Sequence, residues 1–497
     1  MPLTDVAHQF GARSGADSVT AVEVPGVDAR KSPVPTNGNY IKAAKTLACV
    51  AVPLAIWFMP LGLTAPIRAA FAISAFMIIA WMTEAMEYAA AGLVGLLLFW
   101  FFGIAEPAVI FSGFVNDTAW FYLGAMLIGA MATKSGLPQR IANAVIARVG
   151  VTYSRLLLGL IIITFLLTFV VPSGAAVLVI MASIAMGVMK LFGAEKGSNI
   201  GRGLFVAITY TTSIFNKMII AGTASIMSRS IIEQTGGVRV SWGLWFGAFL
   251  PVAIVTIFAA WWLTLKLFPP ETNEPLMSAA SVRAQYRTKA AWTPLSRKAA
   301  VLSAFALLLW TTDWAHGVSP SIVAFGVGLF ALLPFIDVLD ENDFKKINLL
   351  PFFFVAAALG MGEVLKTTGA LAILTDSFIG GIEPLLANKA IALPALYWGG
   401  FFYHFVTASE ISMLVTSLPV LMELARAHGL DPVWIGMIWS FSSGGKLFAY
   451  ESAVLVLGYS FGYFRHTDLI KLGLALTIVD FVVLAGCVAF YWPLLGL

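Results

Sequence analysis

Charge-free stretches long enough to cross a lipid bilayer recur along this chain from Leu47 to its C-terminus. They include Leu47–Leu63, Tyr88–Ala105, Leu156–Met189, Val240–Leu265, Gly317–Ile336 and, apart from Asp480, Leu472–Leu497. A helix needs about 20 apolar residues to span the hydrocarbon core. Because backbone groups in lipid must find partners inside their own segment, such spans are helices. The sequence therefore predicts an all-α polytopic membrane protein with about ten to twelve crossings.

The composition excludes other classes of protein. Hydrophobic residues make up 59% of the chain and charged residues 11%, whereas soluble domains carry about 25% charged residues. A soluble particle of this composition would expose large apolar patches and aggregate. The net charge of +4 is spread along the chain, which excludes a nucleic-acid partner. Two cysteines, Cys49 and Cys487, lie in apolar runs and provide neither a disulfide framework nor a metal cluster.

Polar segments divide the chain into predicted domains. Residues 1–42 are polar and rich in Gly and Pro, which predicts a disordered cytoplasmic tail. The long connection 266–298 has an excess of Lys and Arg, so the positive-inside rule places it in the cytoplasm. These polar segments delimit a first transmembrane half at 43–265 and a second at 299–497. We expect a multi-pass protein of a bacterial-type inner membrane with a cytoplasmic N-terminus.

Two apolar stretches are too long for one helix and are interrupted at their centres. Leu156–Met189 is broken by Pro172-Ser173-Gly174, and Ala390–Met422 carries Ser409 and Glu410 at its centre. Non-helical backbone at membrane depth is tolerated only where it faces protein or a watery cavity. Both interruptions are therefore predicted to be re-entrant hairpins or broken helices that line a site.

The two halves contain an internal repeat. The matching segments are Phe169-Val-Val-Pro-Ser-Gly with Phe405-Val-Thr-Ala-Ser-Glu, Asn116–Lys134 with Asn348–Lys366, and Ala221-Gly-Thr-Ala-Ser with Ala449-Tyr-Glu-Ser-Ala. The partners of each pair lie about 230 residues apart. With an odd number of spans in each half, such a repeat is inverted, and the substrate is expected near the midplane where discontinuous helices meet. This pattern predicts a secondary transporter.

Three further segments carry a family resemblance: Trp81-Met-Thr-Glu-Ala-Met-Glu is similar to W-x-T-E-A-L-P, Lys134-Ser-Gly-Leu-Pro-Gln-Arg-Ile-Ala to K-T-G-L-A-x-R-I-A, and His316-Gly-Val-Ser-Pro to H-G-I-P-P. From Lys42 to its C-terminus the chain resembles the divalent anion:sodium symporter (DASS) family. The resemblance implies about 11 transmembrane helices, two re-entrant hairpins, a homodimer, and elevator-like movement of a transport domain.

The predicted active centre departs from the family pattern. The family carries Ser-Asn-Thr at both hairpin tips, where these residues bind sodium and substrate carboxylates. The matching triplets here are Ser173-Gly174-Ala175 and Ser409-Glu410-Ile411. The paired Thr-Pro turns of the family correspond to Thr223-Ala224 and Tyr450-Glu451. Both asparagines are lost and a carboxylate replaces the second, so the coupling ion, sodium or proton, stays open.

Hairpin tips offer free backbone N–H groups, and a helix N-terminus carries about half a positive charge. An anion is thus bound without an arginine, and hydroxyl groups add donors. The predicted substrate-binding residues are Ser173, Gly174, Ala175, Thr223, Ser225, Ser409, Glu410, Ile411 and Ser452. The alternative for each hydroxyl is a hydrogen bond to its own helix.

Buried charges are the sharpest feature of the sequence. A carboxylate at membrane depth costs a few kcal/mol, so Glu410 and Glu451 should be paired, protonated or bound to an ion. Our hypothesis is that a tethered ammonium of Lys446, together with Lys217, occupies the volume of a sodium ion, while the glutamates neutralise it or shuttle a proton. The alternative is a fixed structural ion pair. The predicted coupling positions are Ser173, Gly174, Lys217, Gly222, Ser409, Glu410, Lys446, Ala449 and Glu451.

The expected function is secondary active transport of small anions, such as dicarboxylates or related organic acids, coupled to a cation by an alternating-access, elevator-like mechanism. The alternatives are a sodium-independent anion exchanger and a proton-coupled carrier with Lys446 in place of sodium. A membrane-embedded enzyme is a remote alternative, because the chain has no D-D-x-x-D, H-E-x-x-H or G-x-S-x-G motif. We expect no cofactor, and no metal other than sodium.

Overall fold

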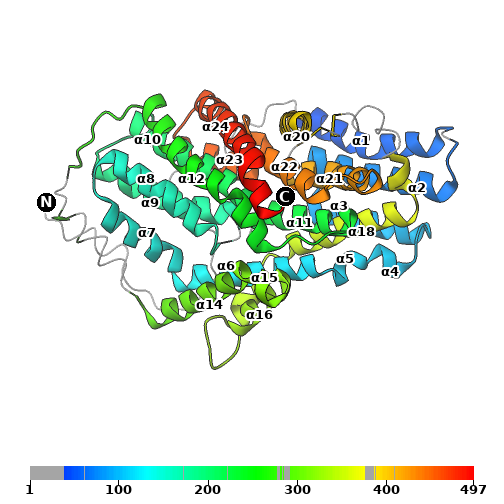
Figure 1. Cartoon of the computed structure of the whole chain (residues 1–497), viewed down its shortest axis with the longest axis horizontal. Helices are drawn as coiled ribbons and strands as arrows, with labels where there is room; N and C mark the ends of the chain where they lie inside the picture. Colours follow the sequence, from blue (N-terminus) through cyan, green and yellow to red (C-terminus); the bar gives the residue numbers. More distant parts are fainter. Residues whose placement is uncertain are drawn as a thin grey trace. The chain divides into compact units, whose positions relative to one another are not determined.

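A computed structural model describes residues 38–60, 62–171, 173–220, 222–276, 280, 281, 284, 292–374, 385, 386, 388–407 and 409–497. The chain divides into two compact units, Met1–Ala44 and Lys45–Leu497. Every regular element in the described residues is helical (Figure 1). The predicted all-α class is therefore confirmed.

The helices of the first half are α1 (Gly38–Phe58), α2 (Ala65–Thr83), α3 (Tyr88–Phe101), α4 (Pro107–Ile110), α5 (Ser112–Val115), α6 (Asp117–Ser135), α7 (Leu137–Val149), α8 (Tyr153–Leu167), α9 (Gly174–Leu191), α10 (Asn199–Met218), α11 (Thr223–Gly236) and α12 (Trp242–Leu267). Those of the second half are α14 (Pro294–Thr311), α15 (Asp313–His316), α16 (Pro320–Phe330), α17 (Glu341–Lys345), α18 (Leu350–Thr367), α20 (Lys389–His404), α21 (Glu410–Ala427), α22 (Pro432–Ser442), α23 (Ala453–Ser460) and α24 (His466–Gly486). A short 3₁₀ turn, η2 (Ala449–Glu451), precedes α23.

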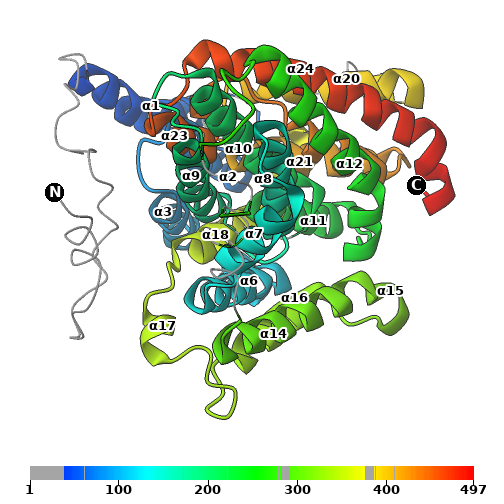
Figure 2. The ribbon, with the colours of Figure 1, turned by 90° about the vertical axis from the view of Figure 1, so that its left-hand side faces the viewer.

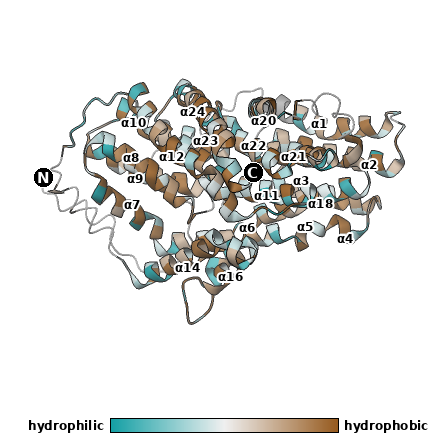
Figure 3. Ribbon diagram, in the orientation of Figure 1, coloured by the Kyte–Doolittle hydropathy of each residue, from teal (hydrophilic) through white to brown (hydrophobic). Residues whose placement is uncertain are grey.

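In the described part of the chain, six helical stretches are long and apolar enough to cross a membrane: Ala65–Thr83, Gly174–Leu191, Asn199–Gly236, Trp242–Leu267, Leu350–Thr367 and His466–Leu495. The stretch Asn199–Gly236 comprises α10 and α11 with the break between them. Shorter apolar helices lie at Ala43–Phe58, Tyr88–Phe101, Tyr153–Leu167 and Pro320–Phe330. Apolar residues cover most of these helices in Figure 3. A multi-pass membrane protein is thus confirmed, while the count of about 11 spans stays a prediction.

Both over-long apolar stretches are broken where the sequence predicts. The first divides into α8 and α9, and the second into α20 and α21. The two helices of each pair contact each other, as in a hairpin. Pro172 and Ala408, which stand at the two tips, lie outside the described residues.

The predicted tail 1–42 falls mostly outside the described residues, which begin at Gly38, the first residue of α1. In the predicted linker 266–298, α12 continues to Leu267 and α14 begins at Pro294. The two halves present their hairpins and broken helices in the same order. The division into domains and the inversion of the repeat remain predictions.

Helices of the second unit pack in two groups. One group contains α2, α3, α6, α14, α16 and α18, in which α6 packs on α16 and α3 on α18. Figure 2 shows α6, α14 and α16 side by side. The other group contains α8 to α12 and α20 to α24, with α11 against α21 and α12 against α24. Each group therefore takes helices from both halves of the sequence.

The crossing of α6 and α16 in the first group depends on glycine. A methyl group on Gly124 of α6 would overlap the backbone of α16 at Ala324 and Phe325. Gly328 of α16 packs against Leu127 of α6 in the same way. Small residues allow such close backbone approach, from which helices in a membrane gain their packing energy.

We predict that Gly124→Ala lowers the free energy of unfolding by about 1–3 kcal/mol, because the added methyl group forces α6 and α16 apart. Gly326→Ala on α16 is the matched control, since its added Cβ meets no atom within 4 Å. Thermal unfolding in detergent measures both variants. Equal stability of the two variants would contradict the role of Gly124.

Candidate functional site

Two broken helices place free backbone groups in the interior of the second helix group. In the first half, α10 ends at Met218 and α11 begins at Thr223. Two indoles of α12 satisfy carbonyl groups at this break: Trp245 Nε1 donates to the Lys217 carbonyl at 2.9 Å, and Trp242 Nε1 donates to the Ile220 carbonyl at 3.0 Å. In the second half, an irregular segment and η2 separate α22 from α23. The breaks are thus fixed by specific donors and acceptors.

One carboxylate oxygen joins the two predicted lysines. Oε2 of Glu410, the first residue of α21, lies 2.6 Å from Lys217 Nζ and is also in contact with Lys446 Nζ. The side chains of Lys217 and Lys446 are 3% and 0% exposed, and that of Glu410 is 18% exposed. The cluster takes its members from α10, from α21 and from the segment after α22. The structure therefore brings together three of the residues selected from the sequence.

Each ammonium has a second partner. Lys217 Nζ donates to Ser443 Oγ at 2.6 Å, and Lys446 Nζ donates to Ser213 Oγ at 2.6 Å. A buried charge is tolerated only when it is paired and its remaining hydrogen-bonding groups are satisfied. Two ammonium groups and one carboxylate leave this cluster, Lys217, Lys446 and Glu410, with an excess positive charge.

Glu451 has a different environment from the one expected. Its side chain is buried, and Oε2 accepts hydrogen bonds from the backbone N–H groups of Leu447 and Phe448 at 2.7 and 2.8 Å. Oε1 has no hydrogen-bond partner among the described residues. His404 lies nearby, with Nε2 3.1 Å from the Glu451 carbonyl and Nδ1 unpartnered within the same described residues. Glu451 therefore binds the backbone of its own broken helix, and neither lysine is among its hydrogen-bond partners.

Most of the predicted hydroxyl groups bond locally. Ser173, Ser409 and Ser452 each accept an N–H from the first turn of the helix that follows, at 3.3, 3.2 and 3.3 Å. Ser225 Oγ donates to the Asn216 carbonyl at 2.5 Å, and Thr223 Oγ1 shares a hydrogen bond of 2.7 Å with Tyr122 on α6. Ser173, Ser409 and Ser452 thus act as helix caps, which is the alternative that the sequence left open.

The remaining predicted positions lie at helix ends. Gly174 and Ala175 open α9, Gly222 precedes α11, Ile411 follows Glu410 in α21, and Ala449 begins η2.

Sequence reasoning missed Asn216. Its side chain is half-buried at the end of α10, next to Lys217, and forms no hydrogen bond with the described residues. A methyl group on Gly174 would overlap the Asn216 amide and approach Val454 to 2.9 Å. The tip of the first hairpin therefore contacts both broken helices. The signal in the sequence that could have identified it is its amide side chain in the last turn before a break in an apolar helix.

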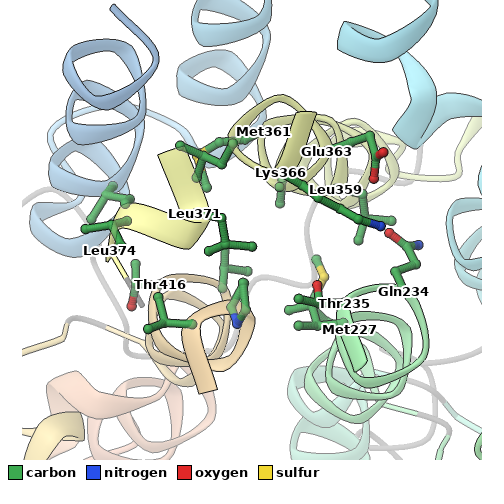
Figure 4. A pocket seen from close by; sticks show the side chains of 18 residues that line it. Met227, Gln234, Thr235, Leu359, Met361, Glu363, Lys366, Leu371, Leu374 and Thr416 are labelled. Carbon is green, nitrogen blue, oxygen red and sulfur yellow. The ribbon is translucent and has the colours of Figure 1, made fainter. Parts of the chain in front are cut away.

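Two cavities lie near these elements. One of about 60 Å³ lies between α2, α11, α18 and α21, and Figure 4 shows Met227, Gln234, Met361, Lys366 and Thr416 on its walls. No predicted site residue lines it.

The other cavity has a volume of about 380 Å³, enough for a small organic acid. Its walls include Glu84, Thr407, Tyr450 and Ala453, so it borders the second hairpin and the start of α23.

We predict that Glu410→Ala lowers the free energy of unfolding by about 3–5 kcal/mol, because it leaves two buried ammonium groups without their carboxylate. Glu341→Ala on α17 is the control: Glu341 and its partner Lys345 are 80% and 65% exposed, so the loss should stay below about 1 kcal/mol. Chemical unfolding in detergent measures both variants. A Glu410→Ala protein as stable as the control would refute the energetic role of this cluster.

Comparison with known proteins agrees with this architecture. Residues 41–497 match the family described as the sodium:sulfate symporter transmembrane region. A "membrane protein" of Cupriavidus necator is 27% identical over 482 residues, which cover 92% of this chain and 93% of the relative. The citrate/succinate antiporter of Escherichia coli K12 is 24% identical over 401 residues, 78% of this chain and 80% of the relative. The L-tartrate/succinate antiporter of Escherichia coli UTI89 is 24% identical over 473 residues, 88% of this chain and 95% of the relative.

These matches confirm the resemblance on which the sequence analysis drew. The matched family is a symporter family and two of these relatives are antiporters, so the expectation that the chain is not an enzyme is confirmed as well. The chain belongs to the DASS family of membrane anion transporters.

Proposed function

We propose that this transporter exchanges small organic acid anions across the membrane without sodium, because two tethered ammonium groups replace the coupling cations. The observation that carries the proposal is the convergence of Lys217 and Lys446 on one oxygen of Glu410, between the ends of broken helices. A sodium ion that is bound only by non-covalent ligands can dissociate on either side of the membrane, so its gradient can drive transport. A lysine ammonium stays with the chain, so a sodium gradient does no work on this site.

The names of the relatives support exchange. Two of them are antiporters of succinate with citrate or with L-tartrate. A carrier that cannot take up energy from an ion gradient still moves one anion against another. The helix N-termini and the excess positive charge of the lysine–glutamate cluster favour an anionic substrate. Dicarboxylates and related organic acids are therefore the first class of substrate to test.

The two helix groups support an elevator-like movement. The group of α8 to α12 and α20 to α24 carries the site, and the group of α2, α3, α6, α14, α16 and α18 is the proposed fixed scaffold. Among the described residues, the polar contacts between the two groups include Thr223 with Tyr122, and Ser412 Oγ, which donates to the Trp81 carbonyl at 3.2 Å. The cavity of Figure 4 lies along the same boundary. A boundary that contains a cavity suits sliding of one helix group against the other.

Proton coupling is the second candidate, favoured by one observation. Glu451 Oε1 and His404 Nδ1 are both buried and unpartnered in the described part of the chain. A buried carboxylate of this kind can carry a proton between the two sides. We further propose a homodimer in an inner membrane with the N-terminus in the cytoplasm.

Counterflow in proteoliposomes tests the proposal. Purified protein is loaded with an unlabelled acid from a panel, and uptake of the labelled acid is measured in sodium chloride, in choline chloride and with an imposed pH gradient. We predict equal uptake in the two salts and no uptake without internal anion. Uptake that needs a sodium gradient and no internal anion would overturn exchange, and uptake driven by the pH gradient would select proton coupling.

Replacing a lysine tests its part in coupling. Lys446→Met removes one ammonium and should lower exchange in choline at least about tenfold, the equivalent of about 1.4 kcal/mol. Sodium should restore part of it by filling the vacated volume. Lys190→Met, at an exposed lysine at the end of α9, is the control and should exchange normally. A Lys446→Met protein with unchanged transport and unchanged ion dependence would refute the proposal.

A further inference from the structure

Acidic residues are distributed unequally between the two halves of the site. Each half supplies one lysine shortly before its matched block, Lys217 before Ala221 and Lys446 before Ala449. Both carboxylates come from the second half. Glu410 stands where the first half has Gly174. When the block that begins at Ala221 is aligned with the block that begins at Ala449, Glu451 stands where the first half has Thr223. The site therefore has two similar ends, and one of them carries carboxylates of its own.

The carboxylates occupy the anion-binding groups of the second-half end. Glu410 Oε2 forms ion pairs with both ammonium groups. Glu451 Oε2 accepts hydrogen bonds from the N–H groups of Leu447 and Phe448. The preceding N–H group, that of Lys446, donates to the Tyr210 hydroxyl at 3.2 Å. Three successive N–H groups of the broken helix thus have acceptors inside the protein. A substrate carboxylate at this end would have to displace an acid tethered to the chain.

The first-half end has no such acid. At Gly174 the chain approaches the Asn216 amide closely, and this amide makes no hydrogen bond with the described residues. Gly222, ahead of α11, provides no side-chain cap. Ser173 is exposed, Asn216, Thr223, Ser409 and Glu410 are half-buried, and Lys446 and Glu451 are buried. Of the four half-buried side chains, that of Asn216 is the one without a hydrogen bond to the described residues.

We propose that Glu410 and Glu451 act as built-in carboxylates at the second-half end, so that the substrate is a monocarboxylate held at the first-half end by the Asn216 amide and the Thr223 hydroxyl. This inference rests on the proposed function, transport of small organic acids. Glu410 already neutralises one of the two ammonium groups, so the cluster offers the substrate a single excess positive charge. A second carboxylate on the substrate finds no further cation in this cluster, and an unpaired charge at this depth is costly.

Lactate and malate are the probes, because malate carries one more carboxylate on the same hydroxy-acid frame. Each unlabelled acid competes with labelled lactate in counterflow by the wild-type protein. We expect lactate to compete at least about tenfold better than malate, the effect of one carboxylate without a partner. Equal or better competition by malate would overturn this inference and leave the proposed exchange intact. Exchange of neither acid, nor of any other in the panel, would instead refute the proposed function.

Variants at Glu451 and Asn216 test which residues cause the preference for lactate over malate. Glu451→Thr introduces the first-half residue and frees the two N–H groups, so competition by malate should strengthen at least about tenfold relative to competition by lactate. Glu451→Gln keeps an acceptor for them and removes the charge, and should give a smaller gain. Asn216→Leu should raise the half-saturation concentration for lactate about tenfold at unchanged thermal stability. Unchanged lactate saturation in a folded Asn216→Leu protein would overturn the assignment, even where the Glu451 variants fail to fold.

Discussion

One carboxylate oxygen shared by two buried ammonium groups is the interaction on which the rest of this structure depends. Lys217 and Lys446 are almost fully buried, and each would be intolerable at that depth without Glu410. The three side chains come from α10, from α21 and from the segment after α22. The cluster therefore forms only when elements from both halves of the sequence pack together, and the same contact that stabilises the helix group creates the charged centre of the site.

Broken helices set the remaining chemistry. Each break frees backbone carbonyl and N–H groups, which must find partners in the absence of water. The carbonyl groups at the end of α10 accept hydrogen bonds from the indoles of Trp242 and Trp245. The N–H groups before α23 donate to Tyr210 and Glu451. The N–H groups of the second break thus find their acceptors within the protein. The first break keeps polar groups within reach of a ligand, among them the Asn216 amide. This difference between the two breaks makes the first-half end the proposed position of the substrate carboxylate.

Physical rules that act along the chain made much of this predictable. Charge-free length predicted the helices, and the Pro-Ser-Gly and Ser-Glu interruptions predicted the breaks before α9 and α21. The cost of buried charge selected Glu410, Lys217 and Lys446. Pairing depends on distances in space, so the sequence could not show that Glu451 binds backbone N–H groups. Asn216 was missed because an amide at a helix end has no periodic signal, and its role depends on Gly174 approaching from another helix.

The central claim, that lysines hold the place of coupling cations, is tested most directly by the thermal stability of the purified protein in sodium chloride and in choline chloride at equal ionic strength. A bound ion stabilises the folded state by RT ln(1 + [L]/Kd). With tethered ammonium groups in place, no sodium binds, and we predict the same unfolding temperature in both salts. A rise of several degrees that saturates with sodium would contradict the claim.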